Sequence, residues 1–68
     1  MSVARVTEIK SSSKKSFKDA IQDGIKRASK TLDNVKSAWI QDQEVTVDES
    51  GDIDEYRVLM KVTFVLKE

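Results

Sequence analysis

The stretch EYRVLMKVTFVL, residues 55–66, alternates apolar and mixed positions without a fault. Its even-numbered positions are all apolar, from Tyr56 to Leu66. A period of two predicts a β-strand, because successive side chains of a strand point to opposite faces of the sheet. We therefore predict a final strand over residues 53–67 with one apolar face and one mixed face. A mixed second face is typical of a sheet that meets another subunit rather than bulk water.

The segment before this strand predicts a turn and a second, irregular strand. DESGD at residues 48–52 favours a turn, in which Gly51 can adopt a positive φ. The second strand is expected to begin near Val35. Its apolar pairs change parity between its first and second halves, at Ala38, Ile40, Val45 and Val47. Since a regular strand cannot hold both pairs on one face, we predict a bulge or sharp bend within residues 41–44.

The clearest periodic signal upstream is that of a helix over residues 14–33. Its apolar positions recur at spacings of three and four, at Phe17, Ala20, Ile21, Gly24, Ile25, Ala28 and Leu32. Gly24 lies inside this stripe and lowers helix stability by about 1 kcal/mol relative to alanine. We therefore expect a strand to pack closely against the helix at Gly24. Asn34 suits the left-handed conformation that ends a helix.

The chain before the helix predicts a first strand over residues 3–9, which read VARVTEI. The serine run at residues 11–13 is interpreted as a polar break, in which Ser12 or Ser13 caps the helix N-terminus. The expected order is thus strand, helix, strand, strand. We predict a single α+β domain over residues 1–68, with one helix packed on one face of a three-stranded, mostly antiparallel sheet.

Composition excludes several classes of function. The chain has no histidine and no cysteine, which removes the commonest general base, thiolate metal sites and disulfides. Twelve basic and twelve acidic residues balance, which argues against nucleic-acid binding. No apolar run is long enough to span a membrane, and residues 1–15 lack a signal-peptide core, so a cytoplasmic, non-enzymatic protein is expected. So small a core needs support, and oligomerisation is the support that remains.

The chain resembles the dodecin family along nearly its whole length. The resemblance rests on the opening MSVARVTEI, the SSSKKSF entry to the helix and AIQDGIKRASKTLDNV along it. VKSAWIQDQEV and EYRVLMKVTFVL continue it through the two long strands. The resemblance implies a hollow, spherical homododecamer whose helices are partly wrapped by curved sheets. It also implies pairwise binding of flavins (riboflavin, FMN or FAD) for storage, buffering and quenching without catalytic turnover.

Two positions depart from the flavin-binding pattern that the resemblance implies. The tryptophan that stacks on the flavin would be expected at Ser37, but the only tryptophan is Trp39, about 7 Å further along the same side of the strand. The glutamine that bonds the polar edge of the flavin would be expected at Arg57, after Tyr56. Arginine donates hydrogen bonds but cannot accept them. These changes resemble a second subgroup, the calcium dodecins.

The sequence leaves more than one role open for each candidate residue. Trp39 is expected to face away from the helix, where it packs in a subunit interface, stacks on a ligand or is exposed to solvent. Arg57 either forms a salt bridge to an acid of another subunit or contacts an anion or the flavin edge. The dense acids around the turn form either a solvated loop or, around a symmetry axis, a cation site. Asp42 is the favoured ligand, because dodecins carry an acid at that position.

These alternative roles lead to two candidate functions. The first is a non-catalytic shell of identical subunits that binds and stores a flavin, with Trp39 stacking, Arg57 and Gln43 supplying polar contacts, and Ser37 lining the cavity. The second is a dodecin-like shell without flavin affinity, which binds a divalent cation such as calcium or magnesium through Asp42 or serves a structural role. The partners expected are other copies of the chain and a small-molecule ligand.

Overall fold

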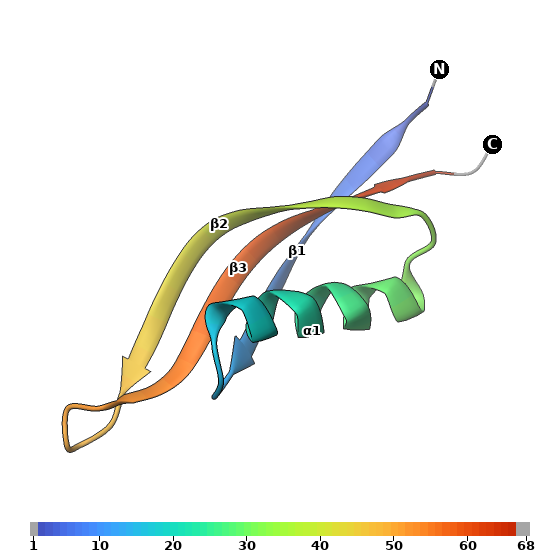
Figure 1. Cartoon of the computed structure of the whole chain (residues 1–68). Helices are drawn as coiled ribbons and strands as arrows, with labels where there is room; N and C mark the ends of the chain where they lie inside the picture. The colour runs from blue at the N-terminus through green and yellow to red at the C-terminus, as the bar shows by residue number, and fades with distance from the viewer. Residues whose placement is uncertain (1, 67–68) are drawn as a thin grey trace.

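The computed structural model describes residues 2–66, which contain one helix and three strands. In chain order these are β1 (Ala4–Ser13), α1 (Phe17–Thr31), β2 (Val35–Val47) and β3 (Ile53–Val65). The expected order and the α+β class are confirmed (Figure 1). Residue 67, the predicted last residue of the final strand, lies outside the described part. No helix among the described residues is long and apolar enough to cross a membrane.

The three strands form one antiparallel sheet in the order β1-β3-β2, so that β3 is the central strand. The sheet curves, and α1 lies along its concave side (Figure 1). The hairpin of β2 and β3 continues past the N-terminal end of α1, which makes the chain 53 Å long and only 19 by 14 Å across. The helix therefore covers part of one sheet face and leaves the hairpin end and the whole convex face uncovered.

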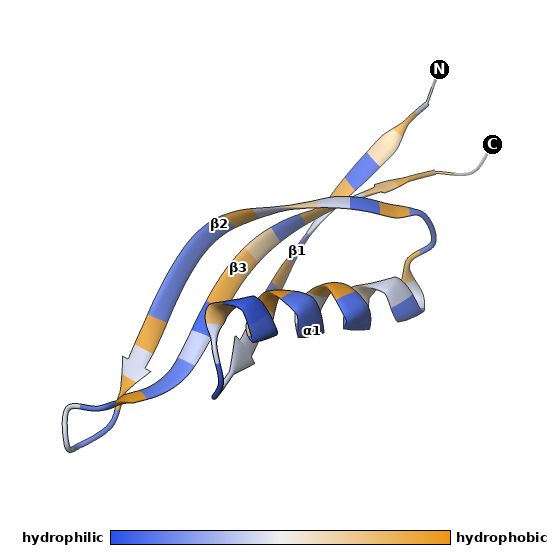
Figure 2. Cartoon of the chain, viewed as in Figure 1, coloured by the Kyte–Doolittle hydropathy of each residue, from blue (hydrophilic) through white to orange (hydrophobic). Residues whose placement is uncertain are grey.

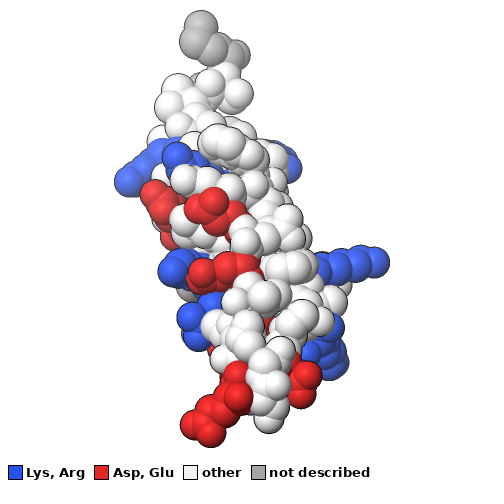
Figure 3. Space-filling model, turned by 90° about the vertical axis from the view of Figure 1, so that its left-hand side faces the viewer, with Lys and Arg blue, Asp and Glu red and all other residues white. Residues whose placement is uncertain are grey.

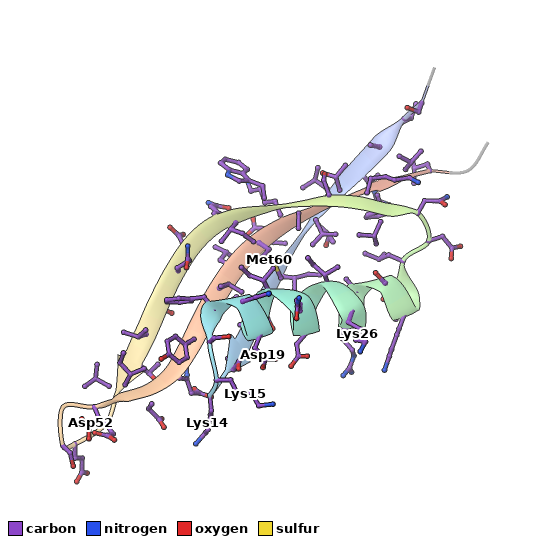
Figure 4. The ribbon with its side chains drawn as sticks, in the orientation of Figure 1. Lys14, Lys15, Asp19, Lys26, Asp52 and Met60 are labelled. Atoms are coloured by element: carbon purple, nitrogen blue, oxygen red, sulfur yellow. The ribbon has the colours of Figure 1, made fainter. Side chains whose placement is uncertain are left out.

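The hydrophobic core lies between α1 and the central strand. Its fully buried residues are Ala20 and Ala28 of the helix and Val58, Met60 and Val62 of β3. The predicted apolar face of the last strand is confirmed, because these even-numbered residues all face the helix. Apolar positions of α1 face the sheet and polar positions face away (Figure 2). Met60, which is 0% exposed, lies above the middle of the helix (Figure 4).

Gly24 is buried at the closest approach of helix and sheet, as predicted. A Cβ at this position would overlap the methyl group of Met60 and would come within 3.0 Å of the Cβ of Ser11. Glycine thus allows β1 and β3 to pack directly on the helix backbone, which explains a residue of low helix propensity inside the apolar stripe.

The change of parity in β2 is resolved by a bulge, as predicted. The register with β3 shifts between Ile40 and Asp42, which places the extra residue at Gln41. After the bulge, Val45 lies opposite Tyr56 and so returns to the side of Ile40, which lies opposite Met60. The predicted positive φ of Gly51 is confirmed at 86°, and that of Asn34 at 59°.

The entry to the helix differs from the prediction. β1 runs through the serine residues to Ser13, which lies opposite Tyr56, so the predicted end at residue 9 and the polar break were wrong. The helix begins at Phe17 rather than at residue 14 and ends at Thr31 rather than at residue 33. Its N-cap is Ser16, whose Oγ accepts a hydrogen bond from the backbone N–H of Asp19 at 2.9 Å. Backbone pairing with β3 engages the earlier serines, which removes Ser12 and Ser13 as caps.

Replacing Ser16 by alanine is expected to lower the free energy of unfolding by about 1 kcal/mol, because a helix N–H loses its acceptor. The matched control is Ser12→Ala, since Ser12 is exposed. This control is expected to change stability by less than about 0.5 kcal/mol. Urea unfolding followed by circular dichroism measures both. Equal effects of the two substitutions would show that the cap has been placed wrongly.

Candidate functional site

Four of the five candidate residues lie on the convex side of the sheet, which we call the outer face: Ser37, Trp39, Asp42 and Arg57. It is the side opposite to α1, since Val58, Met60 and Val62 are buried on the helix side. Alternation places on the outer face the odd-numbered residues of β3 from Arg57 to Thr63 and their cross-strand partners. These are Val6, Glu8, Lys10, Ser12, Ser37, Trp39, Asp42, Glu44, Arg57, Leu59, Lys61 and Thr63.

Trp39 projects from the outer face, as predicted from its position between Ala38 and Ile40. Its side chain is 64% exposed, while Ala38 and Ile40 pack against the core. Lys61 lies directly across on β3, with its Nζ 5.6 Å from the centre of the indole. Such an exposed cation–π contact contributes roughly 0.5–1 kcal/mol, whereas stacking of a flat ring on an aromatic contributes roughly 1–3 kcal/mol. Lys61 therefore does not prevent a ligand from stacking on Trp39.

Ser37 lies on the same side of β2 as Trp39, opposite Thr63. It is exposed and precedes Trp39 by two positions, which corresponds to about 7 Å along the strand. The indole is thus offset along the outer face from Ser37. The hydroxyl groups of Ser37 and Thr63 make this part of the face small and polar.

Arg57 is held on the outer face by an acid of its own strand. Its Nη2 donates a hydrogen bond to Oε1 of Glu55 at 3.0 Å. The Arg57 side chain is 47% exposed, and a pair this open contributes about 0–1 kcal/mol. The guanidinium can therefore exchange Glu55 for another anion at little cost.

A hollow of about 290 Å³ joins three of the predicted site residues. Asp42, Gln43 and Arg57 all line it, together with Lys10, Glu44, Val58 and Leu59. Two cations and two carboxylates meet there, so the hollow suits a ligand with both donor and acceptor groups. Trp39 and Ser37 do not line this hollow, and the structure does not bring them together with the other three.

Gln43 takes a different side of the sheet from Trp39. It lies opposite the buried Val58, so alternation directs its side chain toward the helix side. Within one chain, Gln43 and Trp39 cannot contact the same stacked ring. A joint contact requires a second copy of the chain.

Trp39 and Arg57 lie at different places along the outer face. Trp39 lies opposite Lys61, four residues along β3 from Arg57. Four residues of strand span roughly 13 Å, far beyond hydrogen-bonding distance. The face of one chain therefore offers an aromatic platform at one place and a cationic donor at another.

Asp42 lies on the outer face opposite Leu59 and is exposed. Among residues 2–66, no group of three or more acidic side chains is close enough to hold a metal ion. Calcium takes six to eight oxygen ligands, which the carboxylates of Asp42 and Glu44 in one chain do not supply. A cation at this position would need carboxylates from several copies.

Two lysines that lie beside candidate residues could not be identified from the sequence. Lys61 contacts the indole of Trp39, and Lys10 of β1 reaches the hollow that holds Arg57. Both belong to the mixed faces of their strands, where surface lysines are common. Only the register of β3 with its two neighbours singles them out.

Comparisons with known proteins give one consistent result. Residues 3–67 match the family model of the dodecins. A dodecin from Streptomyces davaonensis has a structure with a TM-score of 0.93 at 36% identity, over 98% of this chain and 97% of its own. A variant of the Thermus thermophilus dodecin gives 0.92 at 31% identity, over all of both chains.

A third relative is the calcium dodecin of Mycobacterium tuberculosis. It is 31% identical over 67 residues, which cover 98% of this chain and 93% of the relative. Its crystal structure, described as that of a calcium-chelating antigen, has a TM-score of 0.83 over 96% of this chain and 91% of its own. Since the family model spans nearly the whole chain and these structures share its β-α-β-β architecture, the chain belongs to the dodecin family.

Proposed function

We propose that this chain assembles into a hollow homododecamer that binds and sequesters a flavin (riboflavin, FMN or FAD) without catalytic turnover. The observation that carries this proposal is Trp39, whose indole is 64% exposed on a sheet face that no element of the chain covers. An indole in this position exposes apolar surface to water in a monomer, and a flat ring can stack on it. The absence of histidine and cysteine supports a binding rather than a catalytic role.

Assembly is part of the proposed site. Because Gln43 points to the helix side of its own sheet, a flavin stacked on one indole meets a Gln43 only from another copy. Arg57 lies about 13 Å along the outer face from the indole. The guanidinium would donate to the carbonyl edge or the phosphate of the ligand. Ser37 and Thr63, small and polar beside the indole, leave room for the ring system.

Titration of riboflavin with the purified protein tests the proposal through flavin fluorescence. We expect saturable quenching at micromolar protein or below, because the indole stacks on the isoalloxazine. Light scattering on the same sample reports whether the chains are assembled. Assembled protein that leaves riboflavin emission unchanged would refute flavin binding.

The second candidate function is cation binding by an assembled shell. It is favoured by Asp42 and Glu44 in one hollow of the outer face, and by the calcium-chelating description of a relative. Copies of Asp42 brought together around a symmetry axis would supply the missing oxygen ligands for calcium or magnesium.

Calorimetric titration with calcium distinguishes the two functions. If Asp42 is the ligand, Asp42→Asn is expected to weaken calcium binding at least tenfold, because the ion loses a charged oxygen in every copy. Asp33→Asn, which removes an acid from outside the hollow, is the control. Equal calcium affinity of both variants and the original chain would exclude Asp42 as the ligand.

A further inference from the structure

The charges of this neutral chain are strongly segregated along the sequence. Residues 37–56 carry seven acidic residues and no basic one. Residues 5–36 carry nine basic residues and four acidic ones. The fold places the acidic segment on β2, the turn and the start of β3, and the basic segment on β1 and α1. One copy therefore presents surfaces of opposite charge at different places.

The acidic surface is the end of the hairpin, residues 45–55, which we call the hairpin tip. The helix covers the hairpin only as far as Tyr56, on which Phe17 packs edge to face at 5.1 Å. Val45, which lies opposite Tyr56, is 38% exposed, and beyond that point Val47 and Ile53 are 59% and 53% exposed. Figure 3 shows acidic side chains at the lower end of the molecule, where the tip lies in Figure 1. The tip thus combines uncovered apolar residues with negative charge.

The basic surface is a groove of about 570 Å³ between β1 and the second half of α1, which we call the basic groove. The helix lines it with the cations Lys26, Arg27 and Lys30, against the single acid Asp23. Ion pairs in the described part of the chain join Lys14 to Asp54 and Arg57 to Glu55, and include none of these three cations. Ile9, Gly24 and Ala28 supply an apolar floor. β1 is an edge strand, so the groove is open along one side.

We propose that the hairpin tip of one copy docks in the basic groove of a neighbouring copy. The two surfaces match in charge, and each also carries apolar residues that association would remove from water. The tip cannot reach the groove of its own chain, because the tip extends beyond the N-terminal end of α1 and the groove lies along its C-terminal half. The occupant is therefore a second copy of the chain.

This inference rests on the self-assembly proposed above and assigns part of its contact surface. Each copy has one tip and one groove, so each gives one contact and receives one. Such a head-to-tail contact is heterologous and closes into rings when the rotation between copies allows. It also covers apolar residues that would otherwise promote aggregation in a free chain.

Charge exchange between the two surfaces tests the proposal. The groove variant is Arg27→Glu with Lys30→Glu, and the tip variant is Glu49→Lys with Asp52→Lys. Asp48 is left unchanged because its carboxylate accepts hydrogen bonds from the backbone of Ser50 and Asp52 in the turn. The matched control is Lys18→Glu with Lys36→Glu, two exposed cations outside the groove.

Analytical ultracentrifugation over a concentration series at 50 mM and 500 mM salt is the measurement. At low salt, each double variant is expected to need about tenfold more protein for half-assembly, since its tip and groove now repel. The quadruple variant is expected to assemble like the original chain, because every copy then carries both exchanged surfaces. The control is expected to be unchanged, and high salt should reduce every difference.

The outcomes separate this inference from the proposed assembly itself. An original chain that stays monomeric at all concentrations refutes self-assembly. An original chain that assembles while both double variants assemble equally well refutes the docking of tip and groove. Docking is also refuted if the quadruple variant loses as much assembly as the two double variants together. Docking predicts instead that exchanging the charges on both surfaces restores their attraction.

Discussion

Replacing Met60 by alanine is expected to lower the free energy of unfolding by roughly 2–5 kcal/mol, the range seen when a buried large side chain is truncated in a packed core. Met60 is 0% exposed and lies at the centre of the cluster that joins helix and sheet. Gly24 of the helix lies against the Met60 methyl group and has no side chain that could fill the cavity. We therefore expect the upper half of the range.

The effect is large for a chain of 68 residues, since small domains bury little surface and have little stability in reserve. Urea unfolding at fixed protein concentration measures it, because the proposed assembly would make the apparent stability depend on concentration. Met60→Leu is the matched control and is expected to lose less than about 1.5 kcal/mol, since the volume is kept. An alanine variant no less stable than the leucine variant would contradict the placement of Met60 at the core.

The parts of the fold that follow from local periodicity could be predicted. Alternation over residues 55–66 fixes which face of β3 is buried, and the spacing of three and four fixes the buried stripe of α1. The change of parity in β2 could be interpreted as a bulge because side-chain direction has a period of two. In the structure, the bulge lies at Gln41.

The helix entry could not be predicted, because four serines in six residues are chemically equivalent caps. The choice between them is made by a long-range interaction. β3 pairs with β1 as far as Ser13 and so removes the earlier serines from the cap position. The first serine free of the ladder, Ser16, adopts extended φ and ψ of −172° and 165° and caps the helix.

The candidate site could be predicted only in part. Parity places Trp39 on the outer face without knowledge of the register, and the structure confirms that placement. The contact of Lys61 with the indole depends on the pairing of β2 with β3, which a bulge shifts by one residue. Gln43 follows that bulge, so its side cannot be inferred from the parity of Trp39. The proposed division of the site between copies depends on an assembly that no single sequence encodes as a local pattern.

Replacing Trp39 by alanine is expected to weaken riboflavin binding by roughly 5- to 150-fold, which corresponds to the 1–3 kcal/mol of stacking on an aromatic ring. The quenching of flavin emission should disappear with the indole, even at protein concentrations that restore occupancy. Trp39 packs on no core residue and is 64% exposed, so the helix and sheet of the protomer should be unaffected. Fluorescence titration, with circular dichroism and light scattering on the same samples, measures all three properties.

Two further variants make this prediction specific. Trp39→Phe keeps a smaller ring and is expected to fall between the original chain and the alanine variant in riboflavin affinity. Lys61→Gln removes the cation above the indole but leaves the ring free, so it is expected to alter the affinity by only a few fold. If Trp39→Ala disrupts assembly while Trp39→Phe does not, the indole serves mainly as a subunit contact. If Trp39→Ala leaves both assembly and riboflavin quenching intact, the exposed indole is not the flavin platform, and the carboxylates of the hollow become the better candidate site.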